Sequence, residues 1–196
     1  MNSVANTRDS VLEAATEVVR AVGFAGVTVS QVASRASVSS GLVHYHFSTR
    51  AALLESVGEL MMTRRAKSRL AALASGKGLA AVDALWMTIT DSVDSGAEAA
   101  VAELVASSSR SAQIRRVVVR VQAEELAALA RRVPGLLAEL GCAALTSTDD
   151  LTGAIRAALD GAASGLVGGA GRHAVRASFD VFWLALVAAG QSAAAR

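Results

Sequence analysis

The sequence predicts an all-α protein with about nine helices, and three observations carry this prediction. Only one proline occurs in 196 residues, so little interrupts helical hydrogen bonding. Aromatic residues, which favour strands, make up 4% of the chain. Apolar residues recur at intervals of three and four, which places them on one face of a helix. With 53% hydrophobic residues, the chain can bury one or two compact cores.

The first helix is expected over residues 7–22, where an apolar stripe runs at helical spacing. Gly23 follows this stripe and should end the helix, because glycine readily adopts the positive φ of a C-terminal cap. Thr28 should begin the second helix, since Thr28 and Gln31 have the spacing of a capping box. The stripe consists of Val11, Leu12, Ala15, Val18 and Val19.

A short third helix is expected from Ser39 or Ser40 to about Tyr45, after a turn at residues 36–38. A long fourth helix follows, with Ser48 as its expected cap, and continues to about Leu73. Two short helices joined by a tight turn, the second polar and aromatic at its tip, are typical of a helix-turn-helix. DNA is therefore the first partner to consider.

The charge pattern also favours a polyanionic partner. No Asp or Glu occurs between Val18 and Leu54, and a carboxylate in a phosphate-facing surface would repel the polyanion. Residues 1–70 contain eight Lys and Arg against five acids, whereas the remainder has eleven against twelve. The sequence pI of about 9.2 therefore reflects a locally basic N-terminal part. A solvated basic surface without a partner is the alternative that charge alone leaves open.

Further helices are expected along the rest of the chain. Pro134 and Gly135 form the strongest interruption, with a short helix after them at residues 136–140. The glycines around residue 169 separate the last two helices. The expected ranges are 79–93, 97–108, 112–132, 151–167 and 172–189.

The first 60 residues resemble the DNA-binding domain of the TetR family of bacterial transcriptional regulators. The resemblance implies a helix-turn-helix domain at residues 1–50 and a helical ligand-binding and dimerisation domain at 51–196. Two positions depart from the family pattern: Ser37 stands where glycine is usual, and Arg50 where lysine is usual. The matching positions are Arg8, Ala14, Ala15, Gly23, Phe24, Gly26, Thr28, Val29, Val32, Ala33, Ala36, residues 38–42, Tyr45, Phe47, Ser48, residues 52–54 and Val57.

The third helix is expected to enter the major groove, where its N-terminal residues meet base edges. Val43 suits a thymine methyl and His44 a purine edge, whereas Leu42 and Phe47 are expected in the core. Ser39 either caps the helix or contacts a base. The expected base contacts are Ser39, Ser40, Val43 and His44, and the expected phosphate contacts are Thr28, Gln31, Tyr45, His46, Ser48 and Arg50.

Useful affinity for DNA requires two such helices held about one helical turn of DNA apart, so we expect a homodimer. The last two helices are the expected interface because they combine large apolar residues with small ones. The alternative is that their aromatic stripe is intramolecular core. The expected interface residues are Leu151, Ile155, Leu159, Ala162, Leu166, Phe179, Phe182, Trp183 and Leu186.

The resemblance further implies an effector that enters the helical body and releases the protein from a palindromic operator. A mostly aliphatic composition favours a small apolar or amphipathic effector. Ordinary core packing is the alternative for each lining residue. The expected lining is Met61, Trp86, Ile89, Leu104, Val117 and Val121.

Other function classes find little support. His44 and His46 are two residues apart and diverge on a helix, so no metal site is expected. No nucleophile–base pair or phosphate-binding glycine loop points to an enzyme, and no cofactor is expected. No apolar run reaches membrane-spanning length, and Cys142 is the only cysteine, which favours the cytoplasm. A constitutive DNA binder and an all-helical enzyme with a DNA-binding head stay as alternatives.

Overall fold

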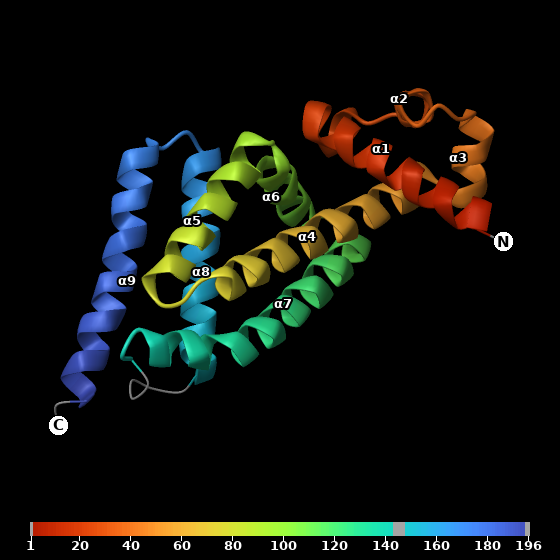
Figure 1. Cartoon of the computed structure of the whole chain (residues 1–196). Helices are drawn as coiled ribbons and strands as arrows, with labels where there is room; N and C mark the ends of the chain where they lie inside the picture. The colour runs from red at the N-terminus through yellow and green to blue at the C-terminus, as the bar shows by residue number, and fades with distance from the viewer. Residues whose placement is uncertain (1, 143–147, 195–196) are drawn as a thin grey trace. The chain divides into compact units, whose positions relative to one another are not determined.

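The computed structural model describes residues 2–142 and 148–194, and within these it contains nine helices and no strand (Figure 1). None of these helices is both long and apolar enough to cross a membrane. The helices are α1 (Asn2–Gly26), α2 (Val29–Arg35), α3 (Ser40–His46), α4 (Arg50–Ser75), α5 (Leu79–Asp94), α6 (Ala97–Ser107), α7 (Ala112–Glu139), α8 (Thr148–Val167) and α9 (Arg172–Ala194).

The chain forms two compact units. Unit 1 extends up to Arg64 and includes Ser95–Val121, so it holds α1, α2, α3, α6 and the first parts of α4 and α7. Unit 2 contains Arg65–Asp94 and continues from Gln122, so it holds α5, α8, α9 and the later parts of α4 and α7. The boundary between the units thus lies inside two helices. The division into functional domains at residue 50 stays a prediction.

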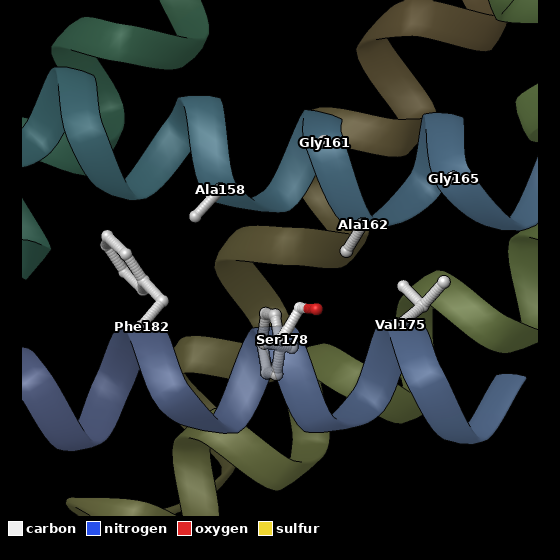
Figure 2. A pocket seen from close by; sticks show the side chains of 8 residues that line it. Ala158, Gly161, Ala162, Gly165, Val175, Ser178 and Phe182 are labelled. Atoms are coloured by element: carbon white, nitrogen blue, oxygen red, sulfur yellow. The ribbon is translucent and has the colours of Figure 1, made fainter. Parts of the chain in front are cut away.

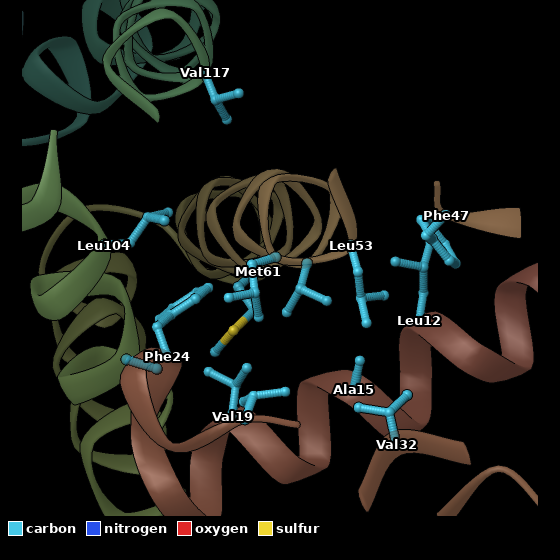
Figure 3. Close-up of a cluster of buried hydrophobic side chains, with 14 of the residues drawn as sticks. Leu12, Ala15, Val19, Phe24, Val32, Phe47, Leu53, Met61, Leu104 and Val117 are labelled. Atoms are coloured by element: carbon cyan, nitrogen blue, oxygen red, sulfur yellow. The ribbon is translucent and has the colours of Figure 1, made fainter. Parts of the chain in front are cut away.

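Unit 1 is built around the apolar stripe of α1, which packs against α2, α3 and α6. Figure 3 shows these side chains near others from α4 and α6, with Val117 of α7 on the other side of α4. Val11, Ala15 and Val19 are at most 1% exposed, as the helical spacing predicted. The cluster includes Val32, Phe47, Leu53, Val57 and Leu104. The helix-turn-helix therefore shares one core with α4, α6 and α7.

The capping box expected at α2 is confirmed. The amide of Gln31 donates to Oγ1 of Thr28, and the amide of Thr28 donates to Oε1 of Gln31 at 2.8 Å. Gly23 has a φ of 72° and interrupts the helical geometry of α1, also as expected, although helix resumes for a further turn to Gly26.

Pro134 does not end a helix, so the expected interruption there was wrong. Residue 134 lies inside α7, which continues to Glu139 and absorbs the short helix predicted after it. Pro134 is exposed, and the carbonyl that loses its helical donor lies on that side. Packing of Val133, Leu136 and Leu137 in the core of unit 2 holds the helix together on the other side.

Unit 2 buries its large apolar residues between α4, α5, α7, α8 and α9. The ring centroids of Trp86 and Phe179 lie 5.6 Å apart, and those of Phe179 and Trp183 lie 6.1 Å apart. Cys142 is 1% exposed in the same cluster, and burial raises the pKa of its thiol. Aromatic and aliphatic side chains thus tie α9 to α5 and α8.

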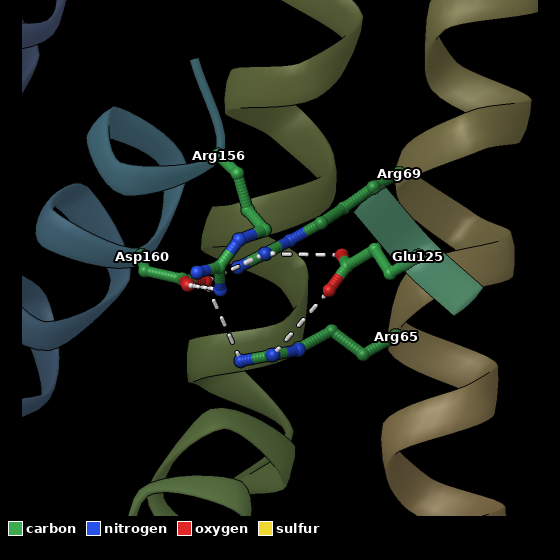
Figure 4. Close-up of polar contacts among 5 residues, drawn as sticks. All are labelled: Arg65, Arg69, Glu125, Arg156 and Asp160. Carbon is green, nitrogen blue, oxygen red and sulfur yellow. Dashed lines mark hydrogen bonds and ion pairs between the residues drawn. The ribbon is translucent and has the colours of Figure 1, made fainter. Parts of the chain in front are cut away.

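Charged side chains are also buried in unit 2, where α4, α7 and α8 meet (Figure 4). Nη1 of Arg69 donates to Asp160 at 2.7 Å and lies 3.3 Å from Oε1 of Glu125. The side chains of Arg69 and Glu125 are 1% and 2% exposed. Arg65 and Arg156 complete the group, the latter through an i,i+4 pair with Asp160. Burial of these charges depends on their mutual pairing.

Candidate nucleic-acid interface

The α3 helix presents a short polar surface because one of its sides is anchored in the core. Ser39 is its N-cap, and its Oγ accepts from the amide of Leu42 at 3.2 Å. Val43 and Phe47, one helical turn apart, are 1% and 4% exposed. Ser40, His44 and Tyr45 consequently lie on the exposed side, where the sequence placed them.

The assignment of Val43 to a base contact was wrong, and so was the assignment of Leu42 to the core. Val43 packs in the cluster of unit 1, whereas Leu42 is only half-buried. Val43 and Leu42 are adjacent and both aliphatic, so composition alone does not tell them apart. The apolar side of α3 that packs in this cluster runs through Val43 and Phe47, at i and i+4. The apolar side chain beside the recognition surface is therefore Leu42.

Tyr45 is the most exposed aromatic residue of the described chain, with 75% of its surface accessible. Its ring meets that of His46 edge-on, with centroids 5.2 Å apart. Arg8 of α1 lies over the ring of Phe47 at 5.0 Å. A phenol ring left in water by the fold, beside the imidazole of His46, is suited to contact with a polar partner.

The turn between α2 and α3 requires a left-handed backbone. Ser37 has a φ of 56° and is the only non-glycine residue of the described chain with a positive φ. The amide of Val38 donates to the carbonyl of Ala33 at 2.9 Å and closes the turn. For serine this left-handed conformation costs on the order of 1–2 kcal/mol. The departure noted at this position is therefore accommodated without loss of the turn.

Two residues expected at phosphates already have structural roles in α2. The side chains of Thr28 and Gln31 bond to each other as well as to the backbone, yet both are exposed. The side-chain nitrogen Nε2 of Gln31 takes no part in these bonds. Their phosphate contacts, like those of His46 and Ser48, stay predictions.

Arg50 at the start of α4 holds the segment between α1 and α2. Its Nε donates to the carbonyl of Val27 at 2.7 Å, and its Nη2 donates to the carbonyls of Phe24 and Ala25. The side chain is exposed, so a phosphate could still approach the remaining nitrogen, Nη1. The first role of this guanidinium in the structure is thus to fix the helix-turn-helix against α4.

Glu103 of α6 holds the same segment from its amide side. Its carboxylate accepts from the amides of Phe24 at 2.9 Å and Ala25 at 3.1 Å. A Cβ at Gly23 would lie 2.8 Å from Oε2 of Glu103 and would displace this carboxylate, and the φ of 72° itself favours glycine there. Nothing in the sequence pattern indicated Glu103, because its partners are 79 and 78 residues away.

Thr49, and not Ser48, caps α4. The amide of Ala52 donates to Oγ1 of Thr49 at 3.0 Å, and the amide of Leu53 donates to the carbonyl of Thr49. The two adjacent hydroxyl residues are equivalent in sequence, and the path of the chain after Phe47 selects the second. Ser48 is left exposed and outside the cap.

The residues expected around an effector are all buried, but they belong to two clusters. Met61, Leu104, Val117 and Val121 lie in the core of unit 1. Trp86 and Ile89 lie in the core of unit 2, where Arg176 stands over the ring of Trp86 at 5.4 Å. A role for these six side chains in lining an effector pocket stays a prediction.

Most of the residues expected at a dimer interface pack inside unit 2. Ile155, Leu159, Phe179 and Trp183 are at most 3% exposed and Ala162 is 8% exposed, so their assignment to an intermolecular surface was wrong. They fill the space between α5, α8 and α9. Helical spacing of apolar residues is the same for an intramolecular core and for a subunit interface, so the sequence pattern did not distinguish the two. The other four, Leu151, Leu166, Phe182 and Leu186, are half-buried against the same cluster.

The opposite side of α8 and α9 was missed. Val181 and Leu184 are 64% and 62% exposed, and the exposed positions of α9 between residues 174 and 189 carry no charge. In the sequence this side of α9 is a stripe of Ala, Ser, Val and Leu at helical spacing. Its residues are smaller than those of the aromatic stripe, and its role in a dimer stays a prediction.

Comparison with known proteins identifies the N-terminal part. Residues 11–57 match the family model described as bacterial regulatory proteins, tetR family. This range spans the stripe of α1, the capping box, α3 and the first turns of α4. Residues 11–57 are a TetR-family DNA-binding domain. The chain therefore contains a domain of the kind found in bacterial DNA-binding regulators, and the role of the surface around α3 as its nucleic-acid interface stays a prediction.

Solved structures of TetR-type proteins share the fold over nearly the whole chain. A regulator assigned to the TetR family from Rhodococcus sp. is 21% identical, with a TM-score of 0.74, over 94% of this chain and 98% of that one. A Mesorhizobium loti regulator assigned to the same family gives a TM-score of 0.75 at 14% identity, covering 96% and 98%. The fold beyond residue 57 is therefore that of TetR-type regulators as well.

A third similar structure carries a small molecule. This transcriptional regulator from Saccharomonospora viridis was solved in complex with choline. It is 16% identical with a TM-score of 0.72, and the match covers 91% of this chain and 95% of that one. No protein with a curated description matches the sequence.

Proposed function

We propose that this protein is a dimeric repressor of the TetR type that acts in the cytoplasm. It binds a palindromic operator through α3 of each subunit and leaves the operator when a small molecule binds its helical body. The exposed polar side of α3 carries this proposal, above all Tyr45 at 75% exposure beside His44 and Ser40. These groups lie on a helix whose other side is anchored in the core, so they are presented rigidly.

Selection of binding sites from a pool of random duplexes tests the DNA-binding part. The expected result is a two-fold symmetric sequence whose half-sites lie about 10 base pairs, or a multiple of this, apart. His44→Ala should relax the selected sequence at one position of each half-site, because it removes a base-edge contact. Tyr45→Ala should weaken binding to all sequences alike, since a phosphate contact carries no sequence information.

A matched control is Met87→Ala on α5, which removes a side chain of 56% exposure from unit 2 and should leave DNA binding unchanged. If the purified protein enriches no sequence from the pool, the proposal is refuted. Equal enrichment with wild type and with a His44→Ala, Tyr45→Ala double variant would refute the role of α3.

The uncharged side of α8 and α9 supports the dimer. A helix side exposed to water over several turns normally carries charged residues, and this one instead carries small and aliphatic residues. Between the two helices lies a groove of about 380 Å³, lined by Gly161, Gly165, Val175, Ser178 and Phe182 among others (Figure 2). The glycines allow close approach of a second helix pair. A second copy of this chain, related by two-fold symmetry, would cover this surface.

The proposal that a small-molecule effector releases the operator rests on the helical body and on α4. This helix starts at Arg50, beside the helix-turn-helix, and continues without interruption into unit 2. A ligand that favours one position of α4 would therefore bias the spacing of the two α3 helices. The choline complex of the Saccharomonospora viridis regulator supports the expectation of a small-molecule effector.

A ligand screen separates a regulated repressor from a constitutive DNA binder. Compounds, choline among them, are first ranked by the increase in Tm that they produce. For a repressor, compounds that raise Tm should also lower operator affinity, because the ligand and the DNA favour different states. Stabilisation without any loss of operator affinity would favour the constitutive binder.

A further inference from the structure

The start of α7 carries an exposed group of arginines that the helix-turn-helix does not include. Residues 107–116 read Ser-Ser-Ser-Arg-Ser-Ala-Gln-Ile-Arg-Arg, and Arg110, Arg115 and Arg116 are all exposed. Within the part of the chain that the structure describes, no hydrogen bond or ion pair holds these three guanidinium groups. We refer to Arg110, Arg115 and Arg116 as the α7 arginines.

Acidic side chains near the α7 arginines are engaged elsewhere. Glu55 of α4 accepts a hydrogen bond from the side chain of Gln113, and Glu59 pairs with Arg120 at 2.8 Å. Glu103 of α6 accepts the two backbone amides at the end of α1. The stretch from Leu104 to Ala123 contains no acid of its own. Among the described residues, none of these three positive charges has an acidic ion-pair partner.

Their position on α7 is also unfavourable for the helix itself. Ser111 caps α7, since the amides of Ile114 and Arg115 donate to its hydroxyl and carbonyl oxygens. No acidic residue occurs in the first turn, and Arg115 and Arg116 follow directly after it. Cations near a helix N-terminus oppose the helix dipole. Local stability does not explain arginines at these positions.

The packing of α7 places these arginines near the DNA-binding elements of the same unit. The bond between Gln113 and Glu55 fixes the first turn of α7 beside α4. Glu55 lies five residues after Arg50, which corresponds to about 7.5 Å along the helix axis. The first turn of α7 therefore lies beside α4 within about two helical turns of Arg50.

We propose that the α7 arginines form an accessory surface for the phosphate backbone of duplex DNA, beside the contacts made by α2, α3 and the start of α4. This inference rests on the proposed function, since it adds to the DNA interface of the same unit. The surface contributes attraction without sequence preference, because guanidinium groups bind phosphates and read no base from there. It therefore strengthens operator and non-operator binding together.

The test measures the dependence of DNA affinity on salt for the full-length dimer, with the selected operator and a scrambled duplex of equal length. Substitution of Arg110, Arg115 and Arg116 by Gln in both subunits should lower the slope of log affinity against log salt by up to about 5, at about 0.9 for each phosphate contact. Affinity for both duplexes should fall about tenfold or more at moderate salt. The same three positions changed to Lys should retain the wild-type slope.

A control of equal charge uses Lys67, Lys77 and Arg131, which are exposed and belong to unit 2. Their replacement by Gln also removes three positive charges and should leave the slope unchanged. An equal fall in both triple variants would show a net-charge effect and overturn the inference. So would a wild-type slope in the α7 variant, in which case the proposed function stands. Failure of the wild type to bind any duplex would overturn both.

Discussion

At the scale of single residues, backbone geometry and a few long-range hydrogen bonds decide how the recognition helix is held. Ser37 adopts the left-handed backbone of the turn between α2 and α3, although it is not a glycine. Arg50 binds carbonyls of the segment between α1 and α2, and Glu103 binds amides of the same segment. These contacts join α1, α4 and α6 within unit 1. The position of the segment between α1 and α2 thus depends on side chains of α4 and α6.

Replacement of Ser37 by glycine should stabilise the protein. Glycine adopts a φ of 56° without strain, and we expect a gain of roughly 0.5–1 kcal/mol in the free energy of unfolding after its greater unfolded-state entropy is counted. Urea denaturation of wild type and variant measures the difference. Ser68→Gly, at an exposed position inside α4, is the control and should cost about 0.5 kcal/mol. A loss of stability in Ser37→Gly would contradict the turn geometry.

Removal of the Glu103 carboxylate should destabilise unit 1 and weaken DNA binding. Glu103→Ala leaves the amide of the buried residue Phe24 without its acceptor, at a cost of about 1–3 kcal/mol. Urea denaturation and operator titration measure the two effects. Asp91→Ala, which removes an exposed carboxylate of α5, should change neither by more than about 0.5 kcal/mol. Equal behaviour of the two variants would rule out the role of Glu103.

At the scale of helices, continuity and buried pairing matter more than local sequence signals. The α7 helix runs through Pro134 because packing of its other side compensates for the missing hydrogen bond. In unit 2, α4, α7 and α8 share a buried ionic group instead of an apolar contact alone. Such a group specifies how helices are aligned, because a displacement would leave a charge buried without its partner.

Arg69→Met tests this alignment. Loss of the guanidinium leaves Glu125 buried with only Arg65 at 3.8 Å, and we expect unfolding to become easier by about 3 kcal/mol. The pair of Arg156 and Asp160 is the control because both side chains are about one-third exposed, so Arg156→Met should cost at most about 1 kcal/mol. Thermal and urea denaturation compare the two. A cost for Arg69→Met no larger than that for Arg156→Met would contradict the interpretation.

At the scale of the whole molecule, the proposed function needs one surface for DNA and another for a second subunit. The exposed side of α8 and α9 lacks charge over several turns and is grooved between the helices. A single α3 helix reads too few base pairs for useful affinity, so the proposed function requires that this surface joins two copies. Dimerisation is therefore part of the proposed mode of DNA recognition.

The double variant Val181→Glu, Leu184→Glu should separate the subunits. Both side chains are more than 60% exposed, so the fold of the single chain should tolerate the change while the interface does not. Sedimentation velocity is expected to show a monomer, and operator affinity should fall at least 100-fold. Leu79→Glu, Met87→Glu is the control, at comparable exposure on α5. A stable dimer in the first variant would exclude this surface.

The sequence by itself determined the helical class, the capping box of α2, the exposed side chains of α3 and the membership of residues 11–57 in the TetR family. These features depend on local spacing, which a sequence contains directly. Only the tertiary structure decided that Val43 and not Leu42 is core, and that Ile155, Leu159, Phe179 and Trp183 face inward. Periodicity shows that a helix has an apolar side, but what covers that side depends on elements distant in the chain. The same holds for Glu103, whose partners are almost 80 residues away.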